Sequence, residues 1–286
     1  MKRAGRLLFV TVPVVAVAVY FAVPDQNDQS GEDGRSDART TSPSASSPST
    51  SSGSAGDLDS PEKKELAQRI VSSAENSSLD WRAQYDYIED IGDGRGYTAG
   101  IIGFTTGTHD LLTLVELYTE SHPDNALEPY LPALRSVDGS DSHEGLDPGF
   151  TAAWKEEAQK DAFKRIQDSQ RDRVYFDPAV RLAKRDGLGA LGQFIYYDAM
   201  VMHGPGDPGF HGIRERAMSE ADTPAEGGSE KKYLDIFLDT RRATMKSEKR
   251  DTTRIDTAQR RFLYDGKLDL EPPLEWKVYG QPYRVT

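Results

Sequence analysis

The chain has 286 residues, of which 36% are hydrophobic and 29% are charged, and it contains no cysteine. Zero cysteines exclude disulfide frameworks, thiol nucleophiles and thiolate metal sites. With 47 acidic against 35 basic side chains, the formal net charge is −12, which argues against a nucleic-acid-binding protein and suits a cationic partner or substrate. The low apolar fraction has a location: the first 57 residues look like a targeting segment followed by a polar tail, which leaves 229 residues, Leu58 to Thr286, to form the core.

The N-terminus carries the pattern of an export signal. Lys2, Arg3 and Arg6 precede an apolar run from Leu7 to Val23, and a basic segment before an apolar one is typical of secretory signals. The run of about 17 residues is near the lower limit for crossing a bilayer, so an uncleaved anchor is the alternative. Both interpretations place the rest of the chain outside the cytoplasm.

Three regions follow from this composition. Residues 1–23 form the signal peptide or signal anchor. Residues 24–57 are rich in Ser, Thr, Gly and Asp, and such a stretch predicts a disordered linker because it cannot offset the entropy of ordering. Residues 58–286 are expected to form a mainly α domain with some β structure.

The first predicted helix begins at Ser60-Pro61, where serine is a favoured cap and proline a favoured first residue. Its apolar residues recur at helical spacing and form one stripe, namely Leu66, Ala67, Ile70, Val71 and Ala74. Glu75 falls beside this stripe, where an apolar edge would raise the pKa of its carboxyl as a general acid requires. The alternative is an ordinary glutamate at a helix end.

The next segment predicts a helix from about Leu79 to Ile91, ended by Gly92. Residues 92–96 are then a tight glycine turn that presents Asp93 to solvent, and residues 97–104 predict a short strand or hairpin. The glycine pattern lacks the Gly-Lys-Ser/Thr ending of a phosphate loop and the alternating ligands of a calcium loop.

Further helices are expected after Thr108, from Trp154 to Ile166, from Asp177-Pro178, and from about Leu188 to Met202. The last is the most apolar and contains Asp198, a costly residue there unless it is paired. Its candidate partners are the arginines at 241, 242 and 254. His203 ends this helix and is a candidate for the wall of a cleft.

Metal and serine-hydrolase chemistry find no support in the sequence. The five histidines show no His-Glu-x-x-His pair or other ligand spacing, and no Gly-x-Ser-x-Gly elbow accompanies a histidine. We therefore expect no metal and no cofactor.

Several motifs together resemble the family 46 chitosanases. They are Ser72–Trp81, Tyr87–Thr98, Arg171–Val180, Tyr196–Ala199, Val201–Gly206 and Pro272–Trp276. The resemblance covers essentially all of 58–286, apart from two stretches, 207–211 and 248–251, which look shorter than usual. It implies a two-lobed, lysozyme-like fold with a cleft between the lobes and a small β-hairpin region. It also implies internal cleavage of β-1,4-linked glucosamine polymers with inversion.

The resemblance also implies roles for individual residues. Glu75 matches the general acid, Asp93 the general base, and Thr98 a residue that helps to hold the attacking water. Asp198, Arg241 and Arg254 match a buried charge network that supports the acid. The substrate-binding matches are Asp110, for an amino group, and along the cleft Ser77, Tyr87, Arg95, Thr108, Tyr175 and His203.

Chitosan is thus the expected partner of a secreted monomer that binds no nucleic acid, and a membrane is involved only if the N-terminal segment is kept as an anchor. We expect Glu75 to be protonated at working pH and Asp93 to be ionised because its turn is solvated. Two alternatives remain open at this stage. One is a lysozyme or transglycosylase acting on peptidoglycan or chitin, and the other is a non-catalytic surface glycan binder.

Overall fold

The computed structural model describes residues 56–286. The predicted signal segment 1–23 and nearly all of the predicted linker 24–57 lie outside the described residues. The first contacts involve Asp57, which pairs with Lys184, and Leu58, which is fully buried and donates its backbone N–H to Gln193. Contacts to the folded domain therefore reach back to the last residue of the predicted linker.

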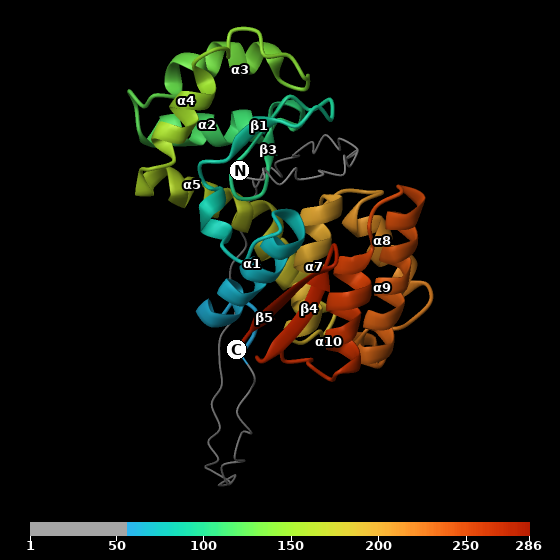
Figure 1. The fold of residues 1–286 in the computed structure, drawn as a ribbon. Helices are drawn as coiled ribbons and strands as arrows, with labels where there is room; N and C mark the ends of the chain where they lie inside the picture. The colour runs from blue at the N-terminus through green and yellow to red at the C-terminus, as the bar shows by residue number, and fades with distance from the viewer. Residues whose placement is uncertain (1–55) are drawn as a thin grey trace, which may run out of the picture.

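The described chain forms two lobes, each with its own hydrophobic core. Figure 1 shows the minor lobe, residues 81–171, above the major lobe, residues 57–80 and 172–286. The minor lobe comprises η1 (Trp81–Gln84), β1 (Ile88–Asp90), β2 (Tyr97–Ala99), β3 (Phe104–Thr105), η2 (Thr106–Thr108), α2 (Asp110–Ser121), η3 (Glu128–Tyr130), α3 (Leu131–Val137), α4 (Phe150–Glu157) and α5 (Asp161–Arg171). The major lobe comprises α1 (Pro61–Glu75), η4 (Asp172–Phe176), α6 (Asp177–Arg185), α7 (Ala190–His203), α8 (Phe210–Met218), η5 (Pro224–Glu226), α9 (Glu230–Ser247), η6 (Arg254–Gln259), α10 (Arg260–Tyr264), β4 (Leu274–Val278) and β5 (Gln281–Val285).

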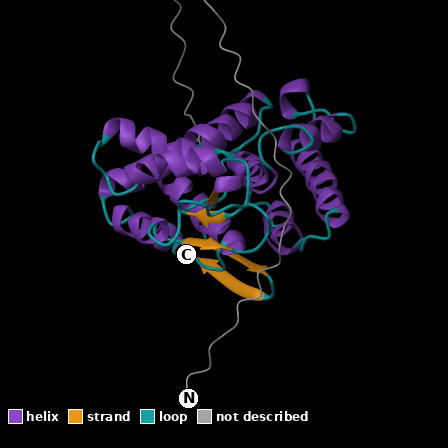
Figure 2. Cartoon of the chain, turned by 90° about the horizontal axis from the view of Figure 1, so that it is seen from above, coloured by secondary structure: helices purple, strands orange, loops and turns teal. Residues whose placement is uncertain are grey.

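The mainly α class is confirmed, and Figure 2 shows helices making up most of both lobes. Helix α1 begins as predicted, with the Ser60 hydroxyl accepting the Lys63 N–H at 3.4 Å, and its predicted apolar stripe is buried. Helix α7 is buried on every side from Ala190 to Met200, so it is the central helix of the major lobe. A helix that is apolar all round is stable only inside a core.

Two predicted helices were wrong. Residues 79–91 form only the short helix η1 and then strand β1, because Ile88, Glu89 and Asp90 pair with Ala99, Thr98 and Tyr97 of β2. The helix predicted for 154–166 is two helices, α4 and α5, separated at residues 158–160. In both cases tertiary pairing and packing outweighed local helical propensity.

The sheet of the minor lobe is a three-stranded antiparallel meander in the order β1-β2-β3. Its central strand places Thr98 opposite Glu89 on one side and Thr105 on the other. The strand or hairpin predicted for residues 97–104 is therefore confirmed, and the glycine turn joins β1 to β2.

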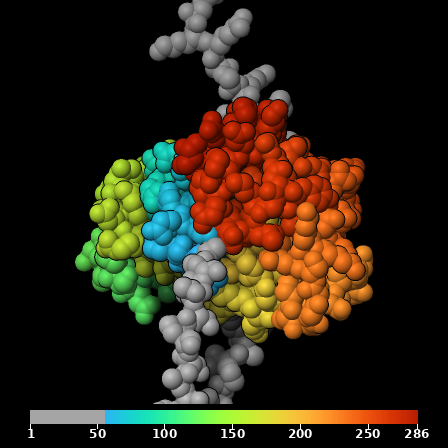
Figure 3. Space-filling view, turned by 90° about the horizontal axis from the view of Figure 1, so that it is seen from below, coloured from blue at the N-terminus to red at the C-terminus, as the bar shows by residue number. Residues whose placement is uncertain are grey.

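Helix α1 lies where the two lobes meet. Figure 3 shows it in blue, between the C-terminal segment in red and the yellow-green part of the minor lobe. Trp276 of β4 donates its indole N–H to Ser73 at 2.9 Å, and Glu65 accepts from Arg82 of η1 at 2.9 Å. Helix α1 is thus held by contacts from both lobes.

Candidate active site

Glu75 is the last residue of α1. The side chain is 37% exposed, and its Oε1 accepts a hydrogen bond from Arg254 Nη1 at 2.7 Å. No hydrogen bond from the described residues reaches Oε2. The predicted apolar environment was wrong: the chain leaves the helix at Asn76, so the carboxyl projects past the buried stripe and meets an arginine.

A buried network stands behind this ion pair. Asp198 of α7 receives Arg254 Nη2 on Oδ1 at 2.6 Å and lies 2.8 Å from Arg241 Nη1 through Oδ2. Gln259 bridges the same groups, because its amide donates to Asp198 Oδ2 at 2.5 Å and accepts from Arg241 at 2.9 Å. The predicted pairing of Asp198 with Arg241 and Arg254 is present, whereas Arg242 pairs with Asp256 instead.

The charges in this network compensate one another. Burial alone would raise the pKa of Asp198, but Arg254 and Arg241 outweigh that effect and lower it to about 2. Asp198 in turn raises the pKa of Arg254 despite burial. Arg254 therefore divides its charge between Asp198 and Glu75.

Asp93 lies in the turn between β1 and β2, flanked by Gly92 and Gly94, both with positive φ. Its carboxyl is only 2% exposed. Arg95 covers it, donating Nε to Oδ2 at 2.8 Å and its backbone N–H to Oδ1 at 3.1 Å. The expectation of a solvated carboxylate was wrong, because the Arg95 side chain and backbone, rather than solvent, surround the Asp93 carboxyl.

Gly96 explains how this turn is held against the lobe. It has a φ of +67°, and an added Cβ would lie 2.2 Å from the Thr106 hydroxyl. The Thr106 hydroxyl itself donates to the Arg95 carbonyl at 3.1 Å. A side chain at this position would push the turn, and Asp93 with it, away from its support.

Thr98 of β2 has a buried hydroxyl that finds no hydrogen-bond partner among the described residues. A buried hydroxyl without a partner is costly, and a water or substrate oxygen would satisfy it. The strand geometry alone does not require threonine here.

Asp110 begins α2 and is strongly desolvated. Its Oδ1 accepts from Thr105 N and the Thr108 hydroxyl, each at 2.8 Å, and from Leu111 N at 2.9 Å. These bonds lower the pKa of Asp110, yet burial prevails and raises it. No ion pair within residues 56–286 involves Asp110, so its charge lacks a cation in this structure.

Other predicted cleft residues lie around these carboxyls. Tyr175 of η4 is half-buried, and its pKa is raised by burial and by Asp110, while Arg95 opposes the rise. Tyr87 is half-buried beside Glu89, and the pKa of its phenol is raised by burial, by Glu89 and by Asp93. Ser77 is exposed just after α1.

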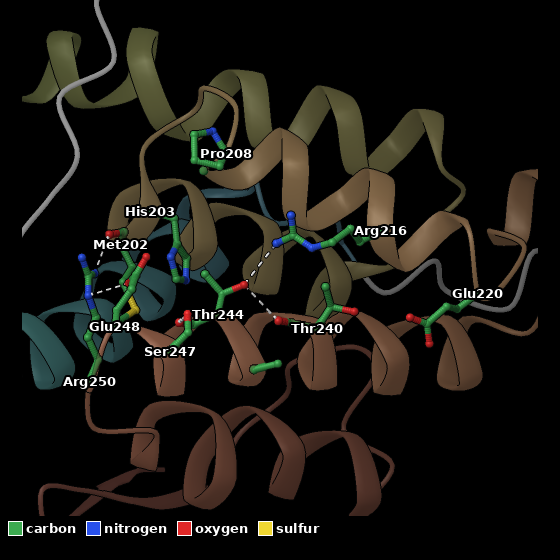
Figure 4. A pocket seen from close by; sticks show the side chains of 12 residues that line it. Met202, His203, Pro208, Arg216, Glu220, Thr240, Thr244, Ser247, Glu248 and Arg250 are labelled. Atoms are coloured by element: carbon green, nitrogen blue, oxygen red, sulfur yellow. Dashed lines mark hydrogen bonds and ion pairs between the residues drawn. The ribbon is translucent and has the colours of Figure 1, made fainter.

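His203, at the end of α7, has a different setting from the rest. Its Nε2 accepts from Arg241 Nε at 3.2 Å, and burial together with the nearby arginines lowers its pKa to about 2. It lines a cavity of about 540 Å³ between α7, α8 and α9. In Figure 4 the histidine lies on one side of this cavity, near Met202 and Arg250. Its contact to the charge network is clear, whereas its contact to substrate stays a prediction.

Arg250 and Gln259 are two residues that the sequence reasoning missed. Arg250 donates to the Met202 carbonyl at 3.3 Å and pairs with Glu248 at 2.8 Å. Burial lowers its pKa, Glu248 and Glu75 oppose this, and Arg95 adds to it. The charges that act on Arg250 therefore come from both lobes. The unusual length of 248–251 was the available signal.

No group of three or more His, Asp or Glu side chains in the described part of the chain is placed to hold a metal ion. Among residues 56–286, no helix has both the length and the apolar character needed to cross a membrane.

The candidate catalytic carboxyls thus come one from each lobe, Glu75 from the major lobe and Asp93 from the minor lobe. The model of glycosyl hydrolase family 46 matches residues 69–274, and the chain belongs to that family. It is therefore a glycoside hydrolase.

Curated relatives agree with this assignment. The chain is 61% identical to the chitosanase of Streptomyces sp. (strain N174) over 233 residues, which are 80% of this chain and 84% of the relative. It is 55% identical to the chitosanase of Nocardioides sp. (strain N106) over the same length and the same shares.

Solved structures extend the likeness to the fold. A co-crystal structure of chitosanase OU01 with substrate matches with a TM-score of 0.77 and 55% identity, covering 80% of this chain and 99% of that one. A Gynuella sunshinyii family 46 chitosanase in complex with chitotetraose matches with a TM-score of 0.71 and 33% identity, covering 78% and 97%. The predicted two-lobed, lysozyme-like architecture is confirmed.

Proposed function

We propose that the protein is an endo-acting chitosanase that hydrolyses β-1,4-glucosamine linkages with inversion. Glu75 acts as general acid and Asp93 as general base. The observation that carries this proposal is the contrast between the two carboxyls. Glu75 is half-exposed with Oε2 unengaged, whereas Asp93 is covered and paired with Arg95.

The acid needs a proton on one oxygen and a fixed direction for it. Arg254 occupies Oε1 of Glu75, so a proton on Oε2 would point toward the leaving oxygen of the substrate. Because Asp198 also binds Arg254, Glu75 is not the only carboxyl that balances this guanidinium. Asp198 and Arg254 are in turn oriented by three positioning residues, Arg241, Gln259 and His203.

The base needs the opposite electrostatics. Asp93 is paired with Arg95, and in the proposed mechanism its carboxylate takes a proton from water as that water attacks the anomeric carbon. Thr98 supplies a hydroxyl for the same water. Inverting enzymes separate the two carboxyls by about 6.5–9.5 Å to admit this molecule.

Recognition of a cationic polymer follows from Asp110. Its Oδ1 is fully used by the start of α2, while Oδ2 and the negative charge remain for a substrate ammonium. Ser77, Tyr87, Arg95, Thr108, Tyr175 and His203 complete the proposed contacts along the cleft. The proposed protein is a secreted monomer, in keeping with the basic and apolar pattern of residues 1–23.

One experiment tests activity, substrate and stereochemistry together. Proton NMR of a fresh digest of glucosamine hexamer should show the α-anomer first, followed by mutarotation. A β-anomer would overturn inversion, and cleavage of fully acetylated but not deacetylated oligomers would favour a lysozyme-like activity. Binding of the hexamer without the appearance of new reducing ends would instead favour a non-catalytic glycan binder.

A further inference from the structure

The turn between β4 and β5 has an unusual residue at its first position. Val278 pairs with Gln281, so the loop has two residues, Tyr279 and Gly280, with φ of 50° and 78°. Two positive φ values define a type I′ turn, which favours Asn, Asp or Gly at its first position. A bulky tyrosine is strained there, and such strain clusters at functional sites.

This turn is fastened beside the partner of Glu75. Tyr279 donates its backbone N–H to the Thr253 hydroxyl at 3.0 Å, and the Thr257 hydroxyl donates to the Lys277 carbonyl. These two contacts flank Arg254 in the sequence, and Arg254 holds Glu75. These two hydrogen bonds therefore fix the position of the turn that carries Tyr279 relative to Glu75, the proposed acid.

The side chain of Tyr279 is open on one side and electrostatically coupled on the other. The residue is 49% exposed, which is unusual for a large hydrophobic side chain in the described part of this protein. The pKa of its phenol is raised by burial and by Glu75 and Asp251, while Arg254 opposes the rise. The backbone hydrogen bond to Thr253 thus places the turn beside the segment that carries Arg254, while Tyr279 remains accessible.

We propose that Tyr279 is a substrate-binding residue whose ring packs against the glucosamine unit next to the bond that Glu75 protonates. A sugar presents an apolar C–H face to such a ring, and the face of a tyrosine attracts an ammonium group. The inference rests on the proposed chitosanase function and adds a contact that the motifs did not indicate.

The turn itself supplies a sharp test, because asparagine suits its backbone better than tyrosine does. Tyr279→Asn should keep or raise Tm while lowering kcat/KM on glucosamine hexamer by about 3- to 30-fold, mainly through KM. Tyr279→Phe should stay within about twofold of the wild type, because it keeps the ring. If Tyr279→Asn lowers Tm instead, Tyr279→Gly, which also suits the turn, replaces it in the comparison.

Tyr264 offers a matched control. It is 56% exposed on α10, and its phenol donates to Asp235 at 3.0 Å rather than lying near Glu75. Tyr264→Asn should leave kcat/KM unchanged. Unchanged kinetics in a folded Tyr279→Asn or Tyr279→Gly protein would overturn this inference alone, since the wild type would still cleave. An inactive wild type would overturn the proposed function and this inference with it.

Discussion

The two lobes hold their proposed catalytic carboxyls by opposite means. The major lobe fixes Glu75 through Arg254, Asp198 and Arg241, which come from separate helical segments and are almost completely buried. The minor lobe fixes Asp93 through Arg95, two residues away. An acid that must hold a proton beside an arginine needs a compensating charge from elsewhere, whereas a base that must stay ionised needs only a nearby cation.

The strongest test of this comparison removes each carboxyl. Glu75→Gln and Asp93→Asn should each reduce kcat by about 10²–10⁴-fold, because each removes a proton-transfer group. Tm should change little for Glu75→Gln, since glutamine still accepts from Arg254. Steady-state rates on glucosamine hexamer, with Tm alongside, provide the measurement. Substantial residual turnover in either variant would reassign that role.

Replacing Asp198 should show how strongly the stability of the major lobe depends on its buried charge network. Asp198→Ala leaves Arg241 buried without a counter-charge and Arg254 with Glu75 alone, so the free energy of unfolding should fall by about 3–5 kcal/mol and turnover should fall as well. Denaturant unfolding measures the first effect. Arg242→Ala is the control, because its partner Asp256 lies outside the network. A silent Asp198 variant would contradict the proposed support of Glu75.

The stability of the two lobes should also depend on pH in different ways, and Asp198 shows this for the major lobe. The pKa of Asp198 is lowered to about 2, so its stabilisation is complete above its unfolded value near 3.8 and is lost as pH falls toward 2. The loss is on the order of 2 kcal/mol. Unfolding free energies at pH 6 and pH 3 should therefore differ more in the wild type than in Asp198→Asn. Equal differences would show that Asp198 does not carry this effect.

The pKa shift of Asp110, in the minor lobe, has the opposite sign to that of Asp198. Burial raises its pKa, so the ionised carboxylate costs stability at neutral pH, and that cost grows as pH rises above the unfolded value. Asp110→Asn keeps an oxygen for the three N–H and O–H donors, and Tm at pH 7 should hold or rise. KM for glucosamine hexamer should rise about tenfold if the charge binds an ammonium. A lower Tm with unchanged KM would mean that Asp110 serves only the start of α2.

Local sequence patterns predicted much of this molecule. Ser60-Pro61, the stripe of α1 and the apolar run of α7 set helices whose register is fixed by periodicity, and the glycines around Asp93 required a turn. Asp198 stood out because an acid in an apolar helix demands a partner, and two of the three candidate arginines supply it. The motifs then linked these residues to a family and thus to expected roles.

Other features were not predicted because they depend on pairing and contacts that a local pattern does not show. Residues 79–91 form η1 and β1 because β1 pairs with β2, and the helical propensity of 79–91 does not indicate that pairing. Gln259 looked like any polar residue until the fold placed it between Arg241 and Asp198. The environment of Glu75 was misjudged for the same reason, since Arg254 is 179 positions away.

Periodicity, caps and charge pattern by themselves determined most of the helical segments, the buried face of α1 and the carboxyls that stand out. Only the tertiary structure decided which cation each carboxyl meets, and therefore how firmly each is held and whether its charge is compensated. The reason is physical: the caps and the apolar periodicity of a helix are written in neighbouring residues, whereas the charges around a desolvated carboxyl are whatever the fold brings within a few ångströms.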